Sequence, residues 1–574
     1  MASRSLPLVP RLGPAPRGSG VVAAFLLLTA IVLLAPASLD PLHYYVGNPT
    51  YPDAAATAWN HWMVHTLGLT GTAHTRMQMY PLVVDVLVLN GFPLDALASW
   101  PFAALLGWPG GYGLYQIAVM WAVGLSAAWL GGRWWRSSTA ACVAGVAMQS
   151  AAPILREFAY GRSTQVFGSI FVPLALGLFA RALVEGRRSD AIGAGVMTGL
   201  CALAYWYYGF FCGLGVLLLL GLAARERLDW VRPTGVYAAA SAVVVFLPAL
   251  YTMGSLGEQQ GGMDTTLFSL IHFGEVDMRL IDLLEERDAG GAMIEGVIGL
   301  TPLVVAFALL GALGHPARRW AAPLIWTVVG GLLAMGPILV WMGDAPLPGP
   351  FALVPSLPVL RRLWWPDRAL LLVVPAVALL AAGGVDRIVQ ALHSPSPRLP
   401  AILTGLLSTA LIAEAWLALP TVPLPVTSSV PSAGAEALAA GTGPVLVLPQ
   451  AGGPYLLNRT LLLDQMFHGR PLVNGLMPPD GTTAPQAYRN FSAGTGMAHL
   501  YSCATTFGTF TGDAAAAVLP LRRAGIREVY VDLAVLSGSA AGSGAYVNCV
   551  RSLLGAPSAA RGPYQVWTLA PAAD

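Results

Sequence analysis

Long apolar runs dominate the first 420 residues of the chain and alternate with short polar segments. Each run is close to the roughly 20 apolar residues that cross the hydrocarbon core of a bilayer. The runs lie at 21–38, 114–131, 138–155, 165–183, 190–205, 207–223, 235–252, 297–314, 320–342, 369–386 and 400–420. The pattern predicts an α-helical polytopic membrane protein with about eleven transmembrane helices.

The first run also has features of a secretory signal peptide. Three arginines precede it, and Ala35-Pro36-Ala37 loosely fits a cleavage site. A signal peptide has a shorter apolar core than this run, which is long enough to span. We therefore expect an uncleaved first helix.

Arginines follow every second apolar run, and short loops rich in arginine stay in the cytoplasm. The arginines of these loops are Arg133 and Arg136, Arg187 and Arg188, Arg225, Arg227 and Arg232, Arg318 and Arg319, and Arg387 and Arg398. This alternation predicts a multi-pass protein of the cytoplasmic (inner) membrane with a cytoplasmic N-terminus. Segments 39–113, 253–296 and 343–368, and everything from about residue 421, then lie outside the cytoplasm.

We divide the chain into a membrane domain, 1–420, and a soluble extracytoplasmic domain, 421–574. Within the first external segment, 39–113, we expect an amphipathic helix from Pro52 to Leu69 and an interfacial segment from Phe92 to Leu106. The last domain alternates short β-rich runs with helical stretches, which is typical of an α/β domain with a small mixed sheet. The expected strands are 445–448, 471–473, 528–532 and 565–569, and the expected helices lie near 454–466, 514–524 and 543–554.

Composition narrows the class further. The chain is 56% hydrophobic and 10% charged, with a net charge of +2. Since soluble domains carry roughly a quarter charged residues, most of this surface faces something other than water. The small net charge predicts no nucleic-acid partner.

Two carboxylates stand out in the first external segment, Asp40 and Asp53. A carboxylate near the membrane surface can act as a general base toward a hydroxyl. Asp53 follows Pro52, so it can equally stabilise the N-terminus of its helix. His61 lies on the same helical face as Asp53.

Charged residues also gather at two external helix ends. Arg156, Glu157 and Arg162 lie between the third and fourth runs, where they either bind a phosphate headgroup or form a surface Arg–Glu pair. Arg361, Arg362 and Arg368 precede the tenth run, where anion binding and ordinary headgroup anchoring are both open.

Three further features have two interpretations each. The aromatic run Tyr205 to Tyr208 can stack on a sugar or form an interfacial belt. His468 is either structural or part of a binding site. Cys503 and Cys549 can form a disulfide outside the cytoplasm, or remain thiols. The other three cysteines, at 142, 201 and 212, fall in predicted spans and should be apolar packing residues.

Several motifs are absent from the sequence. It has no Gly-x-x-x-x-Gly-Lys loop, no Cys-x-x-Cys pair and no His-Glu-x-x-His helix. We therefore predict no cofactor and no metal site, although nothing in the sequence excludes a divalent metal. We also expect acidic residues to gather in loops rather than spans, which argues against an ion-coupled transporter.

With these positions in place, the chain resembles the GT-C superfamily of integral-membrane glycosyltransferases, specifically a large bacterial branch. The resemblance rests on ordered motifs over most of the chain: Tyr51-Pro52-Asp53 with Trp59-Asn60-His61-Trp62, Tyr80-Pro81, Asn90 to Asp95, Trp100-Pro101, Pro366 with Arg368, Leu448-Pro449, and His468-Gly469-Arg470-Pro471. The usual Gly-His after the third span is Gly161-Arg162 here, Trp364 replaces a usual arginine, and the first loop has no Asp-x-Asp or Glu-x-Asp pair.

The resemblance implies an outward-facing enzyme that uses a polyprenyl-phosphate sugar. Asp53 would be the base that deprotonates the acceptor, with inversion at the sugar, and Asp40 the second choice. Asp40, His61, Arg156, Glu157, Arg162, Arg361, Arg362, Arg368 and His468 would bind substrate. The partners would be a lipid-linked sugar donor, membrane lipids and an envelope glycan, lipid or protein acceptor. Two alternatives stay open: a catalytically inactive scaffold of the same fold, and a transporter of lipid-linked sugars.

Overall fold

The structure is a computed structural model, which describes most of the 574 residues. The described residues are 9–14, 16, 18–49, 51–84, 94–224, 231–260, 300–336, 338–339, 347–354, 363, 365–392, 398–419, 421–449, 461–474, 485–503, 508–537 and 542–571. The chain forms two compact units. Unit 1 comprises Met1–Gly47, Gly110–Leu250 and Asp264–Val426, and unit 2 comprises Asn48–Pro109, Tyr251–Met263 and Thr427–Asp574.

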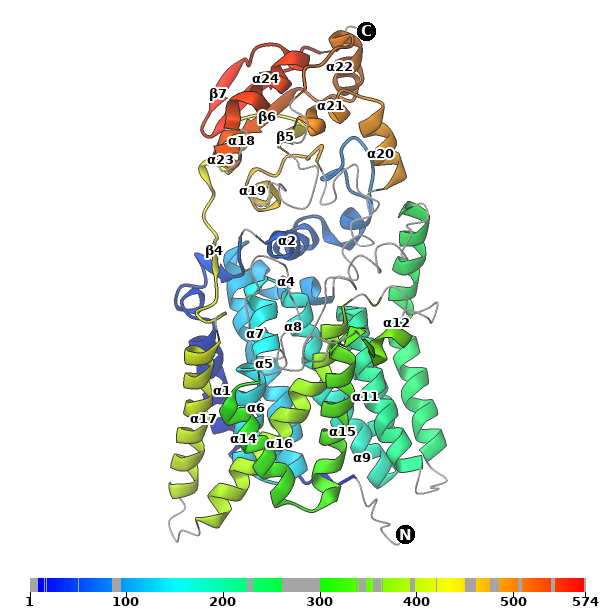
Figure 1. Ribbon diagram of the computed structural model, residues 1–574, viewed down its shortest axis with the longest axis vertical. Helices are drawn as coiled ribbons and strands as arrows, with labels where there is room; N and C mark the ends of the chain where they lie inside the picture. Colours follow the sequence, from blue (N-terminus) through cyan, green and yellow to red (C-terminus); the bar gives the residue numbers. More distant parts are fainter. Residues whose placement is uncertain are drawn as a thin grey trace. The chain divides into compact units, whose positions relative to one another are not determined.

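Unit 1 is built almost entirely of helices that run side by side along its length (Figure 1). In chain order its elements are α1 (Ser19–Leu33), η1 (Ala37–Leu39), β1 (Tyr44–Val46), α5 (Gly110–Trp135), α6 (Ser138–Gln149), α7 (Ala152–Ala159), α8 (Ser163–Ser169), α9 (Phe171–Glu185), α10 (Arg188–Ala204), α11 (Trp206–Ala224), α12 (Val231–Gln260, whose last turns belong to unit 2), α14 (Pro302–Gly314), α15 (Ala317–Ala334), β2 (Ile338–Leu339), β3 (Leu347–Pro348), η3 (Pro350–Leu353), η5 (Pro366–Ala369), α16 (Leu370–Ala391) and α17 (Arg398–Ala418).

Helix α16 forms the centre of unit 1. It packs against α6, α14 and α15, and an apolar window of 18 residues within the span that it forms with η5 is entirely buried. A Cβ on Gly311 of α14 would overlap the carbonyl oxygen of Leu380, and one on Gly384 of α16 would overlap that of Phe307. Small residues let helix backbones approach closely inside membranes, so these glycines bring α14 and α16 into backbone contact.

Each of the eleven predicted spans overlaps a helix. Among the described residues, six segments are long and apolar enough to cross a membrane: Gly110–Trp135, Ser163–Glu185, Trp206–Ala224, Val231–Pro248, Pro366–Ala391 and Arg398–Ala418. Helices α6 and α7, bent by 41° at their junction, make a seventh if they count as one span, and α1 and α14 are shorter apolar helices. The count of eleven therefore stays a prediction.

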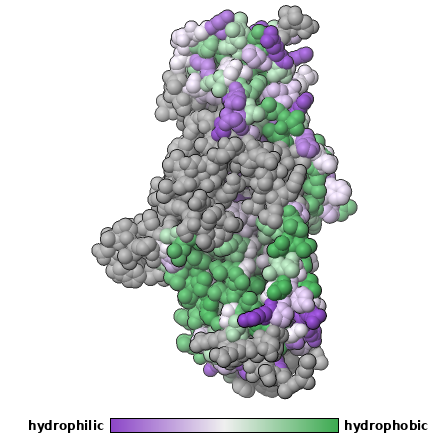
Figure 2. Space-filling model, turned by 90° about the vertical axis from the view of Figure 1, so that its right-hand side faces the viewer, coloured by the Kyte–Doolittle hydropathy of each residue, from purple (hydrophilic) through white to green (hydrophobic). Residues whose placement is uncertain are grey.

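The outer surface of unit 1 is apolar where its helices face outward. Leu217 on α11 and Val236 and Val244 on α12 are 61%, 66% and 64% exposed. Figure 2 shows hydrophobic side chains gathered over the helical unit on this side. Exposed apolar area of this extent indicates a surface that lipid covers.

The expectation that the predicted spans lack buried acidic residues is wrong. Asp386 of α16 is 2% exposed, and its carboxylate accepts a hydrogen bond from the Ser137 hydroxyl at 2.5 Å. Glu414 of α17 accepts from the backbone N–H of Leu303 at 2.7 Å, at the start of α14. Both carboxylates bind neighbouring helix ends, so they have structural roles that hydropathy alone does not reveal.

Unit 2 combines helices from the first external segment with the C-terminal part of the chain. Its elements are α2 (Pro52–Ala73), α4 (Leu94–Leu106), β4 (Val426–Ser428), α18 (Ala433–Ala439), β5 (Val445–Leu448), α19 (Leu461–His468), α20 (Gln486–Ala493), α21 (Met497–Ser502), α22 (Ala514–Arg523), β6 (Glu528–Asp532), α23 (Leu533–Ser537), α24 (Gly542–Leu554), β7 (Ala559–Arg561) and β8 (Tyr564–Thr568). Local sequence defines several helix starts: Asp513 caps α22 through its side chain, and Ser432 caps α18.

The four-stranded sheet of unit 2 has the order β5-β6-β8-β7, with β5 parallel to β6 and the other pairs antiparallel. The strands predicted at 445–448 and 528–532 are confirmed, and β8 is shifted by one residue from the prediction. The strand predicted at 471–473 is wrong, because only Leu472 bridges Val445. At the next position the Asn474 side-chain amide exchanges two hydrogen bonds of 2.8 Å with the backbone of Val447, which replaces a strand partner.

The first external segment contributes α2 and α4 as expected. Helix α2 begins at Pro52, whose ring suits a first helical position, and bends at Gly68. Contacts from this segment reach the C-terminal part within the same unit. The Trp59 indole donates to the Gln465 side chain at 2.6 Å, whose amide in turn donates to the carbonyl oxygen of Met77 at 2.6 Å.

Of the two alternatives left open for Cys503 and Cys549, the structure has the disulfide, which joins the end of α21 to α24 across a sequence separation of 46 residues. The other three cysteines, Cys142, Cys201 and Cys212, are free and buried in helices, as expected for apolar packing residues.

Candidate functional site

The first part of the site lies on the short helix α7 and in the tight turn that joins it to α8. Helix α6 ends at Gln149, and Pro153 lies at the start of α7, where a proline is well tolerated. Helix α7 carries Arg156 and Glu157. Gly161 adopts a φ of +73°, the left-handed region that favours glycine, and Arg162 then occupies the residue before the first turn of α8.

The second part of the site comes from far along the chain. Trp365 is extended before Pro366, as expected for a residue that precedes proline. Pro366 opens the single turn η5, which carries Asp367 and Arg368 and leads directly into α16. The turn therefore fixes both charged side chains at one end of the most buried helix of the unit.

These five side chains form one ion-pair cluster, which we call the arginine–carboxylate cluster: Arg156, Glu157, Arg162, Asp367 and Arg368. Arg156 Nη2 lies 3.0 Å from Asp367 Oδ2. Arg368 donates to Glu157 through Nη1. Glu157 Oε2 also lies 3.6 Å from Arg162 Nη1, and Glu157 Oε1 lies 3.7 Å from Arg156 Nη2.

The cluster is buried. All five residues are between 1% and 5% exposed. The cluster gathers three guanidinium groups and two carboxylates away from water, and such a gathering is stable only when the charges have close partners, as these do.

Aromatic and apolar groups line the rest of this region. The Arg368 guanidinium lies over the ring of Tyr205 at 5.9 Å, and that of Arg162 lies over Tyr160 at 5.1 Å. A narrow pocket is lined by Arg156, Glu157, Asp367 and Arg368 of the cluster and by apolar side chains of α6, α7 and α16. The aromatic run at 205–208 thus contributes to this region through Tyr205 and Tyr208, the latter also lining the pocket.

The arrangement determines which ligand chemistry suits it. Guanidinium forks bind phosphate and carboxylate oxygens bidentately, and cation–π contacts hold the forks in place without consuming their charge. Both carboxylates of the cluster pair with arginines, Asp367 with Arg156 and Glu157 with Arg368.

The structure corrects one interpretation of this region. Arg156, Glu157 and Arg162 do not form a surface pair, because all three are buried. It also adds Asp367, which sequence analysis did not single out. Its position between Pro366 and Arg368 was the available signal, but its partner Arg156 lies 211 residues away. Arg361 and Arg362 lie outside the described residues.

Asp53, the predicted base, belongs to unit 2. It lies in the first turn of α2, half-buried, where a carboxylate also stabilises the positive helix end. Its catalytic role stays a prediction.

His61, further along α2, is 1% exposed. Its Nδ1 lies 2.7 Å from the Ser99 hydroxyl and its Nε2 lies 2.9 Å from Asp95 Oδ2, both on α4. Because both ring nitrogens hydrogen-bond to α4, this histidine joins the two helices of the first external segment. Its predicted contact with substrate is an expectation without structural support.

The two remaining candidates, Asp40 and His468, are distant in the sequence and differ in their surroundings. Asp40 of unit 1 is exposed and pairs with His43 at 2.8 Å. His468 ends α19 in unit 2, and its Nδ1 accepts from the backbone N–H of Arg470 at 3.0 Å. Burial and the nearby Arg470 lower the pKa of His468 to about 3, so the ring is neutral at physiological pH. Its buried Nε2 has no hydrogen-bond partner among the described residues.

Comparisons with known proteins identify similar solved structures but no relative by sequence. No protein-family model matches the chain, and no curated protein matches it by sequence. Solved structures do match. The oligosaccharyltransferase AglB from Archaeoglobus fulgidus, in complex with an inhibitory peptide and a dolichol-phosphate, is 11% identical with a TM-score of 0.51, over 90% of this chain and 69% of that one.

Two bacterial structures match in the same way. ArnT from Cupriavidus metallidurans, bound to undecaprenyl phosphate, is 13% identical with a TM-score of 0.51, over 96% of this chain and 98% of that one. The arabinofuranosyltransferase AftD from Mycobacteria is 15% identical with a TM-score of 0.52, over 92% of this chain and only 36% of AftD. The chain therefore has the GT-C-like fold shared by these membrane glycosyltransferases.

Proposed function

We propose that the protein is a membrane glycosyltransferase that takes its sugar from a polyprenyl-phosphate donor. The observation that carries the proposal is the gathering of three buried guanidinium groups, those of Arg156, Arg162 and Arg368, in the arginine–carboxylate cluster. Guanidinium forks bind phosphate oxygens bidentately, so a phosphate of the lipid carrier is the ligand that this gathering suits. Two matched structures, AglB and ArnT, hold a lipid phosphate themselves, which makes this ligand class the natural one to test.

The cluster residues have distinct roles in this proposal. Arg156, Arg162 and Arg368 hold the phosphate, and Glu157 and Asp367 keep their guanidinium groups oriented. When the bond between the sugar and the phosphate breaks, negative charge grows on the phosphate oxygens. Preorganised cations stabilise such charge without reorganisation, so the arginines lower the barrier as well as bind the donor.

The acceptor side of the reaction is assigned to unit 2. Asp53 removes the proton of an acceptor hydroxyl, and that oxygen attacks the anomeric carbon of the sugar with inversion. The bond to the phosphate breaks, and the lipid phosphate leaves with its electron pair. The acceptor is an envelope glycan, lipid or protein.

The disulfide supports an extracytoplasmic position for the C-terminal part of unit 2. Disulfides persist in oxidising compartments and are rare in the cytosol. We propose a cytoplasmic N-terminus, eleven spans and residues 421–574 outside the cytoplasm. A reporter that is active only outside the cytoplasm, fused after Asp574, should be active. An active cytoplasmic reporter at the same position would contradict this topology.

Complementation of a deletion strain tests the activity, with lipids and envelope glycans measured by mass spectrometry. The deletion should remove one sugar modification and raise its lipid-linked donor. Asp53→Asn should fail to restore the modification at wild-type protein levels. The control Glu436→Gln makes the same change at an exposed carboxylate of the same unit and should restore it fully.

The donor site is tested by Arg162→Gln and Arg162→Lys. The glutamine variant should lose transfer, while lysine, which keeps the charge without the fork, should retain a part of it. Full complementation by both Asp53→Asn and Arg162→Gln would reject the enzyme and favour a scaffold of the same fold. Movement of labelled lipid across vesicles without sugar transfer would favour a transporter.

A further inference from the structure

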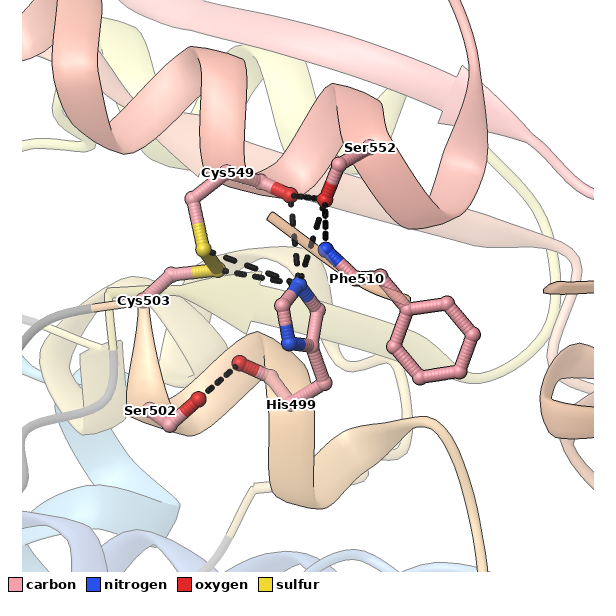
Figure 3. The surroundings of a disulfide bond; sticks show 6 residues. All are labelled: His499, Ser502, Cys503, Phe510, Cys549 and Ser552. Atoms are coloured by element: carbon pink, nitrogen blue, oxygen red, sulfur yellow. Dashed lines mark hydrogen bonds between the residues drawn. A yellow bond between two sulfur atoms is a disulfide. The ribbon is translucent and has the colours of Figure 1, made fainter. Parts of the chain in front are cut away.

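The surroundings of the disulfide in unit 2 contain a histidine that packing and hydrogen bonding do not fully explain. His499 lies on α21, one turn before Cys503, and its ring faces both sulfur atoms (Figure 3). His499 Nε2 lies 3.8 Å from Cys503 Sγ and 3.6 Å from Cys549 Sγ. The same nitrogen lies 3.3 Å from the carbonyl oxygen of Cys549 and 3.4 Å from the Ser552 hydroxyl.

The two distances to oxygen, 3.3 Å and 3.4 Å, are long for hydrogen bonds. N–H···O bonds in proteins have their most common length near 2.9–3.0 Å. The Ser552 hydroxyl is already committed, since it donates to the Cys549 carbonyl at 2.6 Å. His499 Nε2 thus has several polar neighbours and no short partner among them.

The two nitrogen–sulfur distances suit three ligands around one metal ion. In a tetrahedral zinc site with Zn–N near 2.0–2.1 Å and Zn–S near 2.3 Å, a ligand nitrogen and a ligand sulfur lie about 3.6 Å apart. Both nitrogen–sulfur distances here are close to that value. One histidine and two cysteines, whose ligand atoms all lie within 4.8 Å of one another, supply three of the four ligands of a common zinc site.

We propose that the reduced form of this site, with Cys503 and Cys549 as thiols, binds one zinc ion through both sulfurs and His499 Nε2. Each thiol loses its proton on binding, so two protons are released per ion. Water takes the fourth position on the side of Ser552. The disulfide and the zinc complex are therefore alternative cross-links between the end of α21 and α24.

Conversion between the two forms is balanced by a disulfide reagent. One zinc-bound thiolate attacks the reagent and forms a mixed disulfide, which releases one reagent thiolate. The second cysteine thiolate attacks the cysteine sulfur of the mixed disulfide. The protein disulfide forms, and the other reagent thiolate and the zinc ion are released. A newly exported chain carries thiols, so zinc can occupy the site before oxidation without any added reductant.

The test measures zinc bound by the full-length protein in detergent after reduction by a phosphine and removal of free metal. The reduced wild type should retain one zinc more than Cys503→Ser/Cys549→Ser, which reports the background of the other three cysteines. Cobalt in place of zinc should give thiolate charge-transfer absorption. His499→Gln should weaken zinc binding by at least about tenfold, whereas His74→Gln, an exposed histidine of the same unit, should leave it unchanged.

Two results would overturn the proposal. One is equal zinc content in the reduced wild type and the double serine variant. The other is unchanged affinity in His499→Gln, which would make the site a dithiol alone. If reduction unfolds this part of the chain, zinc must restore the protease resistance of the oxidised form, and failure to do so also rejects the site.

Discussion

Neutralising Glu157 should destabilise unit 1 strongly, because this carboxylate faces all three guanidinium groups of the arginine–carboxylate cluster. At an effective dielectric constant near 20, an ion pair at the 3.6 Å of Glu157 and Arg162 has a gross attraction of about 4–5 kcal/mol. Removing one partner of a buried pair costs about 3–5 kcal/mol, since the other charge stays buried. Glu157→Gln removes one negative charge from among three buried guanidinium groups, and we expect a loss of stability in this range.

A double-mutant cycle separates charge balance from local packing. Arg162→Gln alone removes one positive charge from the cluster, and the double variant with Glu157→Gln removes one charge of each sign, so it keeps the net charge of the wild type. We expect the double variant to be about 1–3 kcal/mol more stable than the sum of the single losses predicts. Unfolding in mixed micelles, followed by tryptophan fluorescence, measures each variant.

A surface pair in the same unit is the control. Glu185 and Arg187 lie 2.9 Å apart, but their side chains are 29% and 59% exposed. Pairs of this kind contribute about 0–1 kcal/mol. If Glu157→Gln costs no more than Glu185→Gln, or if the losses in the cycle simply add, the reasoning from charge balance is wrong.

Three other predictions concern stability. Burial raises the pKa of Asp464 from 3.8 to about 6, so the native form holds its proton more tightly than the unfolded chain. The stability that this protonation contributes is present below pH 4 and is lost as the pH rises through about 6. Asn stays neutral, so Asp464→Asn should slow hydrogen exchange in α19 at pH 7.5, which corresponds to a rise of at most about 3 kcal/mol in the free energy of opening. The same variant should have little effect at pH 4. Gln465→Ala should expose α2 to proteases and cost about 1–3 kcal/mol, because it leaves the buried Trp59 indole without this acceptor. Gly384→Ala should lower the thermal midpoint of the solubilised protein, whereas Gly405→Ala, where an added Cβ meets nothing within 4 Å, should not.

The sequence predicted the elements well where short-range pattern determines them. Apolar runs gave the positions of the helices in unit 1, and the strand at 528–532 is reproduced residue for residue because all five of its residues are buried. The strand at 471–473 failed for a reason invisible in a pattern of hydrophobicity. There an asparagine side chain substitutes for a backbone partner.

The candidate site was predictable only in part. Arg156, Glu157, Arg162 and Arg368 were identified as charged residues at helix ends, but their burial and mutual contacts depend on tertiary packing. Asp367 was missed for the same reason, because its partner is distant in the sequence. The roles of Asp53 and of the other substrate-binding candidates stay predictions.

The make-up of unit 2 determines how its parts can move. Backbone hydrogen bonds tie the first external segment to the C-terminal part, from Leu472 to Met77 at 2.9 Å and from Met79 to Asn474 at 2.9 Å, beside the side-chain bridge through Gln465. A fragment cut at residue 421 would lack these partners and is a poor choice for isolated expression. In the intact chain, these hydrogen bonds join α2 to the C-terminal part, so a displacement of that part should also displace α2 and the carboxylate of Asp53 in its first turn.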